Sequence, residues 1–230
     1  MDWSEANIPT QEGRTAIITG ANSGIGFHAA LSLAKRGAHV VLACRNKEKA
    51  SQAVTEILKQ VESASYSVME LDLSQLTSVR DFAEQALSSL SNIDLLINNA
   101  GVMIPPHTIT EEGFELQFVT NHLGHFALTG LLMPRLLQTE NSRVVTVSSR
   151  AHNIGFINFD DLHRKRFYLA WGAYGQSKLA NLLFAYELDR KLRSAGHRTK
   201  SIASHPGYTT SQITQHSPLV QFATDHVAQD

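Results

Sequence analysis

The sequence has almost no cysteine, no long hydrophobic run and no excess of charge of either sign. One cysteine in 230 residues excludes an intramolecular disulfide and fits a reducing compartment. No stretch approaches the roughly 18 apolar residues that a membrane-spanning helix needs, and the first residues lack the basic and apolar regions of a secretory signal. The formal net charge is −1 without a long run of Lys or Arg, so neither nucleic acid nor an anionic membrane is indicated as a partner. We therefore expect a cytoplasmic protein without a membrane span.

Short apolar runs alternate with longer segments of helical spacing from Arg14 to about Ser204. The runs predict buried parallel strands at Thr15–Thr19, His39–Ala43, Ser67–Leu71, Ile93–Ile97, Val144–Val147 and Ser201–Ala203. The segments between them predict helices at Gly24–Arg36, Lys47–Gln60, Leu76–Leu90, about Glu111–Leu137 and Ala173–Arg193. This alternation predicts an α/β fold of the Rossmann type, a doubly wound parallel sheet in a three-layer α/β/α arrangement.

No linker, low-complexity tract or internal repeat divides the chain, so we expect a single nucleotide-binding domain over residues 1–230. Residues 1–13 are predicted to be a lead-in segment. Residues 205–230 carry scattered polar residues with no clear period, and the last strand that can be placed ends near Ala203.

A glycine-rich turn joins the first predicted strand to the first predicted helix. In Thr19–Gly26, glycines 20, 24 and 26 would allow a sharp turn, a close approach of the backbone to a pyrophosphate and tight packing of the helix on the strand. The spacing is G-x-x-x-G-x-G rather than G-x-G-x-x-G, and a glycine loop alone is also compatible with a plain tight turn. The run Asn98–Gly101 at the end of the fourth strand makes dinucleotide binding the better interpretation.

The end of the second strand indicates which dinucleotide is bound. NAD-binding proteins usually place Asp or Glu here to bind the ribose hydroxyls, but this chain has Arg45 and Asn46, with no carboxylate before Glu48. A guanidinium binds a 2′-phosphate through charge-assisted hydrogen bonds, so NADP(H) is favoured. Asp72, after the third strand, has two open interpretations: a contact beside the adenine, or a helix cap.

Tyr174 and Lys178 lie four residues apart, which places both side chains on one face of a helix. A cation beside a phenol favours the phenolate, so Lys178 is expected to lower the pKa of Tyr174 from about 10 toward the working range of an acid–base catalyst. Alone, the Tyr-x-x-x-Lys spacing is a weak signal. The glycine loop and the Asn98–Gly101 run strengthen it.

Together these motifs closely resemble the short-chain dehydrogenase/reductase superfamily over essentially the whole chain. T-G-x-x-x-G-x-G, N-N-A-G, Y-x-x-x-K and the P-G turn after the sixth strand match Thr19–Gly26, Asn98–Gly101, Tyr174–Lys178 and Pro206–Gly207. The branch resembles the retinol dehydrogenases and the WW-domain-containing oxidoreductase in Ala43–Asn46, Asn121–Phe126, Val144–Ser149 and Gln176–Asn181.

The resemblance implies four catalytic residues. Asn121 would position the water that connects the lysine to solvent, and Ser149, rather than its competitor Ser148, would bind the substrate oxygen. Tyr174 would be the acid/base, while Lys178 would adjust its pKa and hold the nicotinamide ribose. The implied cofactor-binding residues are Gly20, Asn22, Ser23, Gly24, Ile25, Gly26, Arg45, Asn46, Asp72, Leu73, Asn99, Ala100, Gly101, Tyr174, Lys178, Pro206, Gly207 and Thr209.

We expect no metal site. His122 and His125 are three residues apart on a predicted helix, but no carboxylate or cysteine accompanies them, so packing or surface roles are the better interpretation.

The sequence departs from the family pattern in two places. Ser149 and Tyr174 are 25 residues apart (174 − 149), about twice the distance in much of the superfamily. The extra segment, about Asn153–Ala170, would either form a wall of the substrate site or be a surface excursion packed on its own aromatic residues. Relatives also continue through a substrate-covering helical segment to a seventh strand, and neither a complete lid nor that strand is recognisable before Asp230, so we expect a shortened form.

These observations predict an NADP-dependent oxidoreductase that interconverts an alcohol and a carbonyl on a lipophilic small molecule. The resemblance further implies a homodimer, through the helices around Glu111–Leu137 and Ala173–Arg193. The alternative is a non-catalytic NADP-binding sensor or interaction module, which typically loses the tyrosine or the lysine. A sugar epimerase is disfavoured by the loop spacing and the short C-terminal part.

Overall fold

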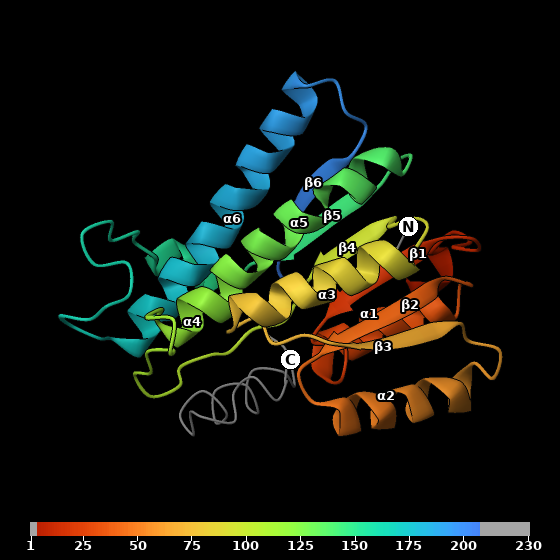
Figure 1. Cartoon of the computed structure of the whole chain (residues 1–230), viewed down its shortest axis with the longest axis horizontal. Coiled ribbons are helices and arrows are strands. Elements are labelled where there is room, and N and C mark those ends of the chain that lie inside the picture. Colours follow the sequence, from red (N-terminus) through yellow and green to blue (C-terminus); the bar gives the residue numbers. More distant parts are fainter. Residues whose placement is uncertain (1–3, 208–230) are drawn as a thin grey trace.

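The computed structural model describes residues 4–207, which form a six-stranded parallel sheet with helices on both faces (Figure 1). The strands are β1 (Thr15–Thr19), β2 (His39–Cys44), β3 (Tyr66–Glu70), β4 (Leu95–Asn98), β5 (Arg143–Val147) and β6 (Lys200–Ser204), in the order β3-β2-β1-β4-β5-β6. The helices are α1 (Gly24–Ala34), α2 (Lys47–Gln60), α3 (Leu76–Ser89), α4 (Leu116–Phe118), α5 (Gly124–Gln138) and α6 (Ala170–Ser194). Short 3₁₀ turns η1 (Glu5–Asn7) and η3 (Arg150–Ile154) and a π-turn η2 (Val119–Leu123) complete the description.

The central strands are buried on both faces, and alternate residues supply two separate cores. In β1, Ala16 and Ile18 face the core under α1 and α2, whereas Ile17 faces the core under α3 and α5. Figure 1 shows α3, α5 and α6 together on one side of the sheet. The predicted doubly wound α/β fold is therefore confirmed.

The strand order reverses between β1 and β4, because the chain runs outward through β2 and β3 and then returns to build β4, β5 and β6 on the other side. Parallel sheets bind ligands at the carboxyl ends of the strands beside such a reversal. The fold therefore brings the loops that follow β1 and β4 to one place.

Most predicted boundaries agree with the structure to within two residues, but the helix predicted from Glu111 is wrong in its first part. Gly113, at φ +88°, lies in a turn, and Ile109 bridges Glu115 in antiparallel fashion. The Glu115 carboxylate then caps α4 by accepting hydrogen bonds from the backbone N–H of Gln117 and Phe118, at 3.0 and 2.7 Å. The helical stretch consequently begins at Leu116. Helix α6 begins at Ala170, three residues before its predicted start.

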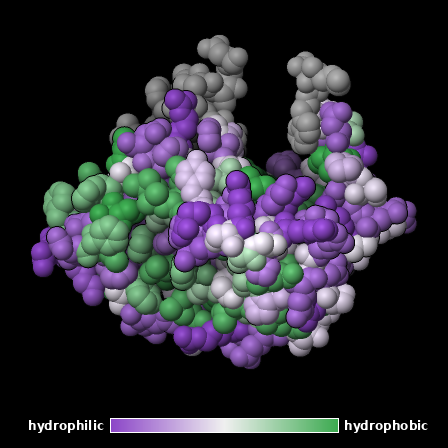
Figure 2. All heavy atoms as spheres, turned by 90° about the horizontal axis from the view of Figure 1, so that it is seen from above, coloured by the Kyte–Doolittle hydropathy of each residue, from purple (hydrophilic) through white to green (hydrophobic). Residues whose placement is uncertain are grey.

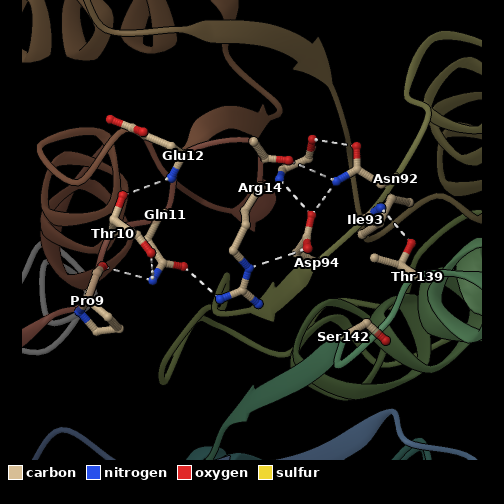
Figure 3. A network of polar contacts seen from close by, with 12 residues as sticks. Pro9, Thr10, Gln11, Glu12, Arg14, Asn92, Ile93, Asp94, Thr139 and Ser142 are labelled. Atoms are coloured by element: carbon tan, nitrogen blue, oxygen red, sulfur yellow. Dashed lines mark hydrogen bonds and ion pairs between the residues drawn. The ribbon is translucent and has the colours of Figure 1, made fainter.

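A polar network fixes the amino ends of β1 and β4, opposite the carboxyl ends that the glycine loop and the Asn99–Gly101 loop follow (Figure 3). Asp94 accepts a hydrogen bond from the backbone N–H of Thr15 at 2.9 Å and forms an ion pair with Arg14 at 3.3 Å. Arg14 also donates to Gln11 at 2.9 Å, so the lead-in segment is tied to the sheet. The predictions for a partial lid and a missing seventh strand concern residues outside the described part of the chain.

Candidate active site

The sequence-predicted site residues follow the carboxyl ends of all six strands. The glycine loop follows β1, Arg45 follows β2, Asp72 follows β3, Asn99–Gly101 follow β4 and Ser149 follows β5. Pro206 and Gly207 follow β6, and Thr209 lies outside the described residues. The fold thus gathers segments from most of the chain at one edge of the sheet.

Two glycines of the loop are required by its geometry. Gly20 has φ +67°, and a Cβ there would lie 3.0 Å from Ala100. A Cβ on Gly26 would lie 2.5 Å from the Asn99 side chain and from the carbonyl oxygen of Gly20, so no other residue fits. Ser23, the N-cap residue of α1, makes no side-chain capping bond. The first backbone N–H groups of α1, which follow Asn22 and include that of Ile25, are therefore available to an anionic ligand.

Thr19 connects the glycine loop to the loop after β4. Its hydroxyl oxygen accepts hydrogen bonds from the backbone N–H groups of Asn99 and Ala100, both at 2.9 Å. The Asn99 side chain returns a bond to the Thr19 carbonyl at 2.8 Å. One hydroxyl group therefore fixes the spacing of the two loops, a role that the sequence analysis missed.

His125 continues this network toward the catalytic residues. Its Nδ1 lies 3.0 Å from the carbonyl oxygen of Asn121 and its Nε2 lies 2.8 Å from the hydroxyl of Thr19. A carbonyl only accepts, so Nδ1 carries the proton and Nε2 accepts from Thr19. Complete burial lowers the pKa of His125 to about 3, so the ring is neutral at physiological pH. The sequence predicted a packing role and did not reveal this bridge.

Asn121 lies in the π-turn η2, where the helical hydrogen-bond pattern is interrupted. Its side chain accepts from the backbone N–H of Val102 at 2.8 Å and donates to the carbonyl of Val102 at 3.0 Å and to the Ser177 hydroxyl at 3.0 Å. A Cβ on Gly101 would lie 3.0 Å from this amide oxygen. Asn121 therefore locks the Asn-Asn-Ala-Gly loop against α6.

The two serines after β5 have different surroundings. Ser148 is buried and donates to the carbonyl oxygen of Lys178 at 2.8 Å, so its hydroxyl is engaged by the backbone of α6. Ser149 instead has its hydroxyl beside the phenol of Tyr174, where it favours the phenolate, and accepts from the backbone N–H of Ala151 at 3.2 Å. The geometry thus brings Ser149, the predicted partner, to the tyrosine.

Tyr174 and Lys178 are both buried on the inner face of α6, with the Lys178 Nζ 5.7 Å from the centre of the Tyr174 ring. Burial lowers the pKa of Lys178 to about 8, and its ammonium donates to the carbonyl of Val147 at 3.2 Å. Burial raises the pKa of Tyr174, and the Ser149 hydroxyl only partly opposes this. The expected lowering of the tyrosine pKa is therefore wrong for the protein in this state, because desolvation outweighs the polar contacts.

The residues predicted to select the cofactor lie at the ends of β2 and β3. The Arg45 side chain is 71% exposed, and its guanidinium lies 4.0 Å from the Asp72 carboxylate. Asn46 caps α2 by accepting from the backbone N–H of Lys49 at 2.7 Å. Asp72 accepts two bonds from Ser74, at 2.9 and 2.6 Å, in a turn before α3, while Leu73 is buried in the core. The helix-cap interpretation of Asp72 is wrong, because Gln75 is the N-cap residue of α3 and the Asp72 carboxylate closes a turn with Ser74 instead. Arg45 keeps its freedom to bind a ligand.

The segment between β5 and α6 is fastened beside Tyr174 by two buried glutamines. Gln117 donates to the Tyr168 hydroxyl at 2.9 Å and to the carbonyl of Ala170 at 3.0 Å. Gln176 donates to the carbonyl of Leu162 at 2.8 Å and accepts from Asn158 and Arg164, each at 3.1 Å. Neither glutamine was recognised in the sequence, since a single polar residue on a helix has no distinctive pattern.

Three further observations concern the described residues. Cys44 is buried at the end of β2, and burial raises the pKa of its thiol to about 11. In residues 4–207 no three His, Cys, Asp or Glu side chains gather as metal ligands would. Over the same range, every helix is too short or too polar to cross a bilayer.

Comparison with known proteins identifies the family. The model for the short chain dehydrogenase family matches residues 14–219, which is most of the chain. The chain belongs to the short-chain dehydrogenase family. Its predicted membership is thus confirmed.

The retinol dehydrogenase-like character is also confirmed. Human retinol dehydrogenase 13 is 45% identical over 217 residues, covering 94% of this chain, and mouse retinol dehydrogenase 12 is 47% identical over 208 residues, covering 90%. The chain spans 64% and 65% of the lengths of these two relatives.

Solved structures of this short-chain dehydrogenase family have the same fold. A crystal structure of an uncharacterised protein from Mycobacterium paratuberculosis is 46% identical, with a TM-score of 0.82 over 97% of this chain and 77% of that chain. A short chain dehydrogenase from Shigella flexneri, complexed with NADP, is 25% identical, with a TM-score of 0.72 over 90% of this chain and 82% of that chain.

Proposed function

We propose that this short-chain dehydrogenase is an NADP-dependent oxidoreductase that interconverts an alcohol and a carbonyl group on a lipophilic small molecule. The observation that carries the proposal is the convergence of Ser149 with the buried Tyr174 and Lys178, while Asn121 holds the adjoining loop. When bound, NADP(H) would supply or accept the hydride. The glycine loop and the open N-terminus of α1 would hold its phosphates.

The chain's own residues would handle the proton. Ser149 would hydrogen-bond the substrate oxygen, and the Tyr174 phenol would donate a proton to it in reduction or accept one in oxidation. Because burial raises the pKa of Tyr174, the protonated donor form is favoured, which suits carbonyl reduction. Lys178 has a pKa of about 8 and can therefore replenish that proton near neutral pH.

Turnover of NADPH with a panel of apolar aldehydes and ketones tests the proposal. Oxidation of NADPH that depends on the carbonyl compound would support it. NADPH binding without turnover of any compound would favour the non-catalytic module instead. That alternative is weakened by the presence of all four catalytic positions.

Arg45 supports the preference for NADP, together with the NADP and NADPH complexes of the relatives from Shigella flexneri and Escherichia coli. We expect Arg45→Ala to weaken NADP binding by about 1–3 kcal/mol, the scale of a charge-assisted contact, and to leave NAD binding almost unchanged. The loss also leaves Asp72 uncompensated near the 2′-phosphate. Calorimetric titration with both cofactors measures this, and equal losses for NADP and NAD would contradict the assignment.

We also propose that the protein forms a homodimer through α5 and α6. Large apolar side chains are exposed on these helices, namely Phe126, Leu131, Leu183 and Tyr186. Light scattering at increasing concentration should give a mass approaching two chains, and Leu183→Glu should return the protein to a monomer. A wild-type protein that stays monomeric at high concentration would contradict the proposal.

A further inference from the structure

The segment that joins β5 to α6 exposes most of its large apolar side chains. Phe156, Phe159 and Phe167 are 70%, 82% and 72% exposed, and Ile154 and Leu169 are exposed as well. The alternative expectation, an excursion packed on its own aromatic residues, is therefore wrong. Isolated exposed hydrophobic residues are ordinary, but several in one short segment indicate an interaction surface.

This exposure does not come from a loosely held backbone. Gln176 binds the main chain at Asn158 and Leu162, and Gln117 binds the Tyr168 hydroxyl, which itself donates to the carbonyl of Pro105 at 3.0 Å. A Cβ on Gly155 would lie 2.4 Å from the carbonyl of Gly175, so the beginning of the segment lies directly against α6. The hydrogen-bonding groups of the segment face the protein and hold its backbone in place, whereas the phenylalanine side chains point into solvent.

Basic side chains lie among the exposed aromatic residues. Lys165 and Arg166 are exposed and immediately precede Phe167. The Asp161 carboxylate accepts from the backbone N–H of both, at 2.9 and 3.0 Å, so it is committed to the turn. Residues 154–171 contain three Lys or Arg and two Asp, a net charge of +1 (3 − 2), whereas the whole chain has −1. The charge balance of the whole chain does not reveal this local excess of positive charge.

The segment is also placed where it can reach a flat surface. Figure 1 shows it projecting beyond the sheet and the helices at one end of the molecule. Figure 2 shows apolar side chains gathered at that same end, with hydrophilic ones beside them. Phe156, Phe159 and Phe167 project into solvent, whereas the anchor residues of a protein–protein interface are usually buried in a recessed pocket.

We propose that residues 154–171, the basic–aromatic segment, bind the surface of an anionic lipid bilayer. Phe156, Phe159 and Phe167 enter the boundary between headgroups and acyl chains, while Lys165 and Arg166 contact anionic headgroups. Aromatic side chains can enter a fluid lipid interface without a shaped pocket. The negative charge of the bilayer complements the positive charge of the segment. This association requires no membrane-spanning helix and does not depend on the proposed enzymatic activity.

The position of Trp171 connects this surface to the candidate active site. Its ring is 40% exposed and meets the ring of Tyr174 edge-on, with centroids 6.4 Å apart. One end of the basic–aromatic segment therefore reaches the proposed acid/base. If the proposed function holds, an apolar substrate dissolved in the bilayer would enter beside this tryptophan.

Sedimentation of the purified protein with lipid vesicles tests the proposal. The protein should bind vesicles of phosphatidylcholine mixed with phosphatidylserine, more weakly in high salt, and bind poorly to phosphatidylcholine alone. The double variant Lys165→Gln/Arg166→Gln should bind the anionic vesicles about 25-fold more weakly, at about fivefold for each charge. The triple variant Phe156→Ser/Phe159→Ser/Phe167→Ser should lose at least about tenfold on the same vesicles.

Matched control variants distinguish binding through this segment from nonspecific adsorption of the protein to the vesicles. Tyr66→Ser removes an exposed aromatic ring from β3, and Lys59→Gln/Lys191→Gln removes two exposed charges elsewhere, so neither should change vesicle binding. In a Trp3→Phe background Trp171 is the sole tryptophan, and its emission should shift to the blue on anionic vesicles. Unchanged thermal unfolding will show that the variants fold.

Wild-type protein that does not bind anionic vesicles would overturn the proposal. Binding that survives both sets of substitutions in the basic–aromatic segment would also overturn it. So would a triple variant that loses self-association by light scattering while its vesicle binding stays intact, because the occupant would then be a second copy of the chain. NADPH binding and turnover are measured separately, so failure here leaves the proposed function standing.

Discussion

The core beneath α1 and α2 and the region between α5 and α6 are built from different kinds of contact. In α1 and α2 no buried residue is polar, and residues such as Ile57 pack against Ile18 and Leu42 of the sheet. Around η2, α5 and α6 the chain instead buries a series of polar side chains: Gln117, Asn121, His125, Thr129, Gln176, Ser177, Lys178 and Asn181. The first region contributes stability through area removed from water, whereas the second depends on each polar group meeting its partner.

The difference matters because the two kinds of contact tolerate change differently. Apolar packing has no preferred direction, so a small change in volume costs little and is felt locally. A buried polar group that loses its partner costs the full desolvation of that group, and its neighbours lose their positions. Substitutions in the two regions should therefore separate stability from function.

The largest effect is expected from Tyr174→Phe. This change keeps the ring but removes the group placed to exchange the substrate proton, so turnover should fall by about two to four orders of magnitude. NADPH affinity should survive, since the glycine loop, Arg45 and Lys178 are unchanged. Steady-state kinetics together with fluorescence titration of NADPH measure both, and a variant that turns over normally would refute the assignment.

Lys178→Met should lower turnover but raise the free energy of unfolding. Folding lowers the lysine pKa from 10.5 to about 8, so burial of the charge costs about 3 kcal/mol at neutral pH. Removing the charge should raise the free energy of unfolding by up to about that amount while impairing turnover and NADPH binding.

The sign of the pH dependence provides a second check on Lys178. At Lys178 the unfolded chain holds more of the proton than the folded one between pH 8 and 10.5, so the contribution of this residue to wild-type stability should rise with pH across this window. Urea unfolding at a series of pH values should show that the stability advantage of Lys178→Met over the wild type shrinks as pH rises from 8 to 10.5. Parallel curves for the two proteins would contradict the lowered lysine pKa.

Thr19→Val tests the polar region without touching a candidate catalytic residue. It leaves the partly buried N–H groups of Asn99 and Ala100 without this acceptor and removes the donor to His125. We expect a loss of about 2–3 kcal/mol in the free energy of unfolding, together with weaker NADPH binding. Thr19→Ser keeps the hydroxyl and should behave like the wild type.

The matched change in the apolar region is Ile57→Val, which is expected to have the smallest effect of this series. Ile57 is fully buried in the core under α2, so the lost methylene should cost about 1 kcal/mol. NADPH affinity and turnover should stay unchanged. If Ile57→Val impaired cofactor binding as much as Thr19→Val, the distinction between the two regions would fail.

Much of the fold was predictable because its signals are local. The buried strands are short runs of Val, Ile and Leu, and α2 was predicted to its last residue because Asn46 caps it and an amphipathic pattern follows. The start of the helical stretch at Leu116 was not predictable in the same way. Its boundary depends on the turn at Gly113, and the π-turn at Val119–Leu123 then shifts the helical period.

In the candidate site, too, local motifs were predictable from the sequence and long-range contacts were not. Its glycines and its Tyr-x-x-x-Lys pair form compact motifs, whereas the bond between Thr19 and His125 joins residues 106 positions apart. The pKa of Tyr174 also depends on burial, which a sequence motif does not contain, so the direction of its shift was missed. Distant polar pairs and desolvation are tertiary properties.

The buried thiol of Cys44 has a practical consequence for spectroscopy. A pKa of about 11 keeps the thiolate, the reactive form, at a very small fraction near neutral pH. The natural chain therefore serves as an unreactive background for maleimide chemistry without first being made cysteine-free. A single cysteine introduced at an exposed position such as Phe159 would carry a spin label or fluorophore selectively, and its signal would report the surroundings of that one position.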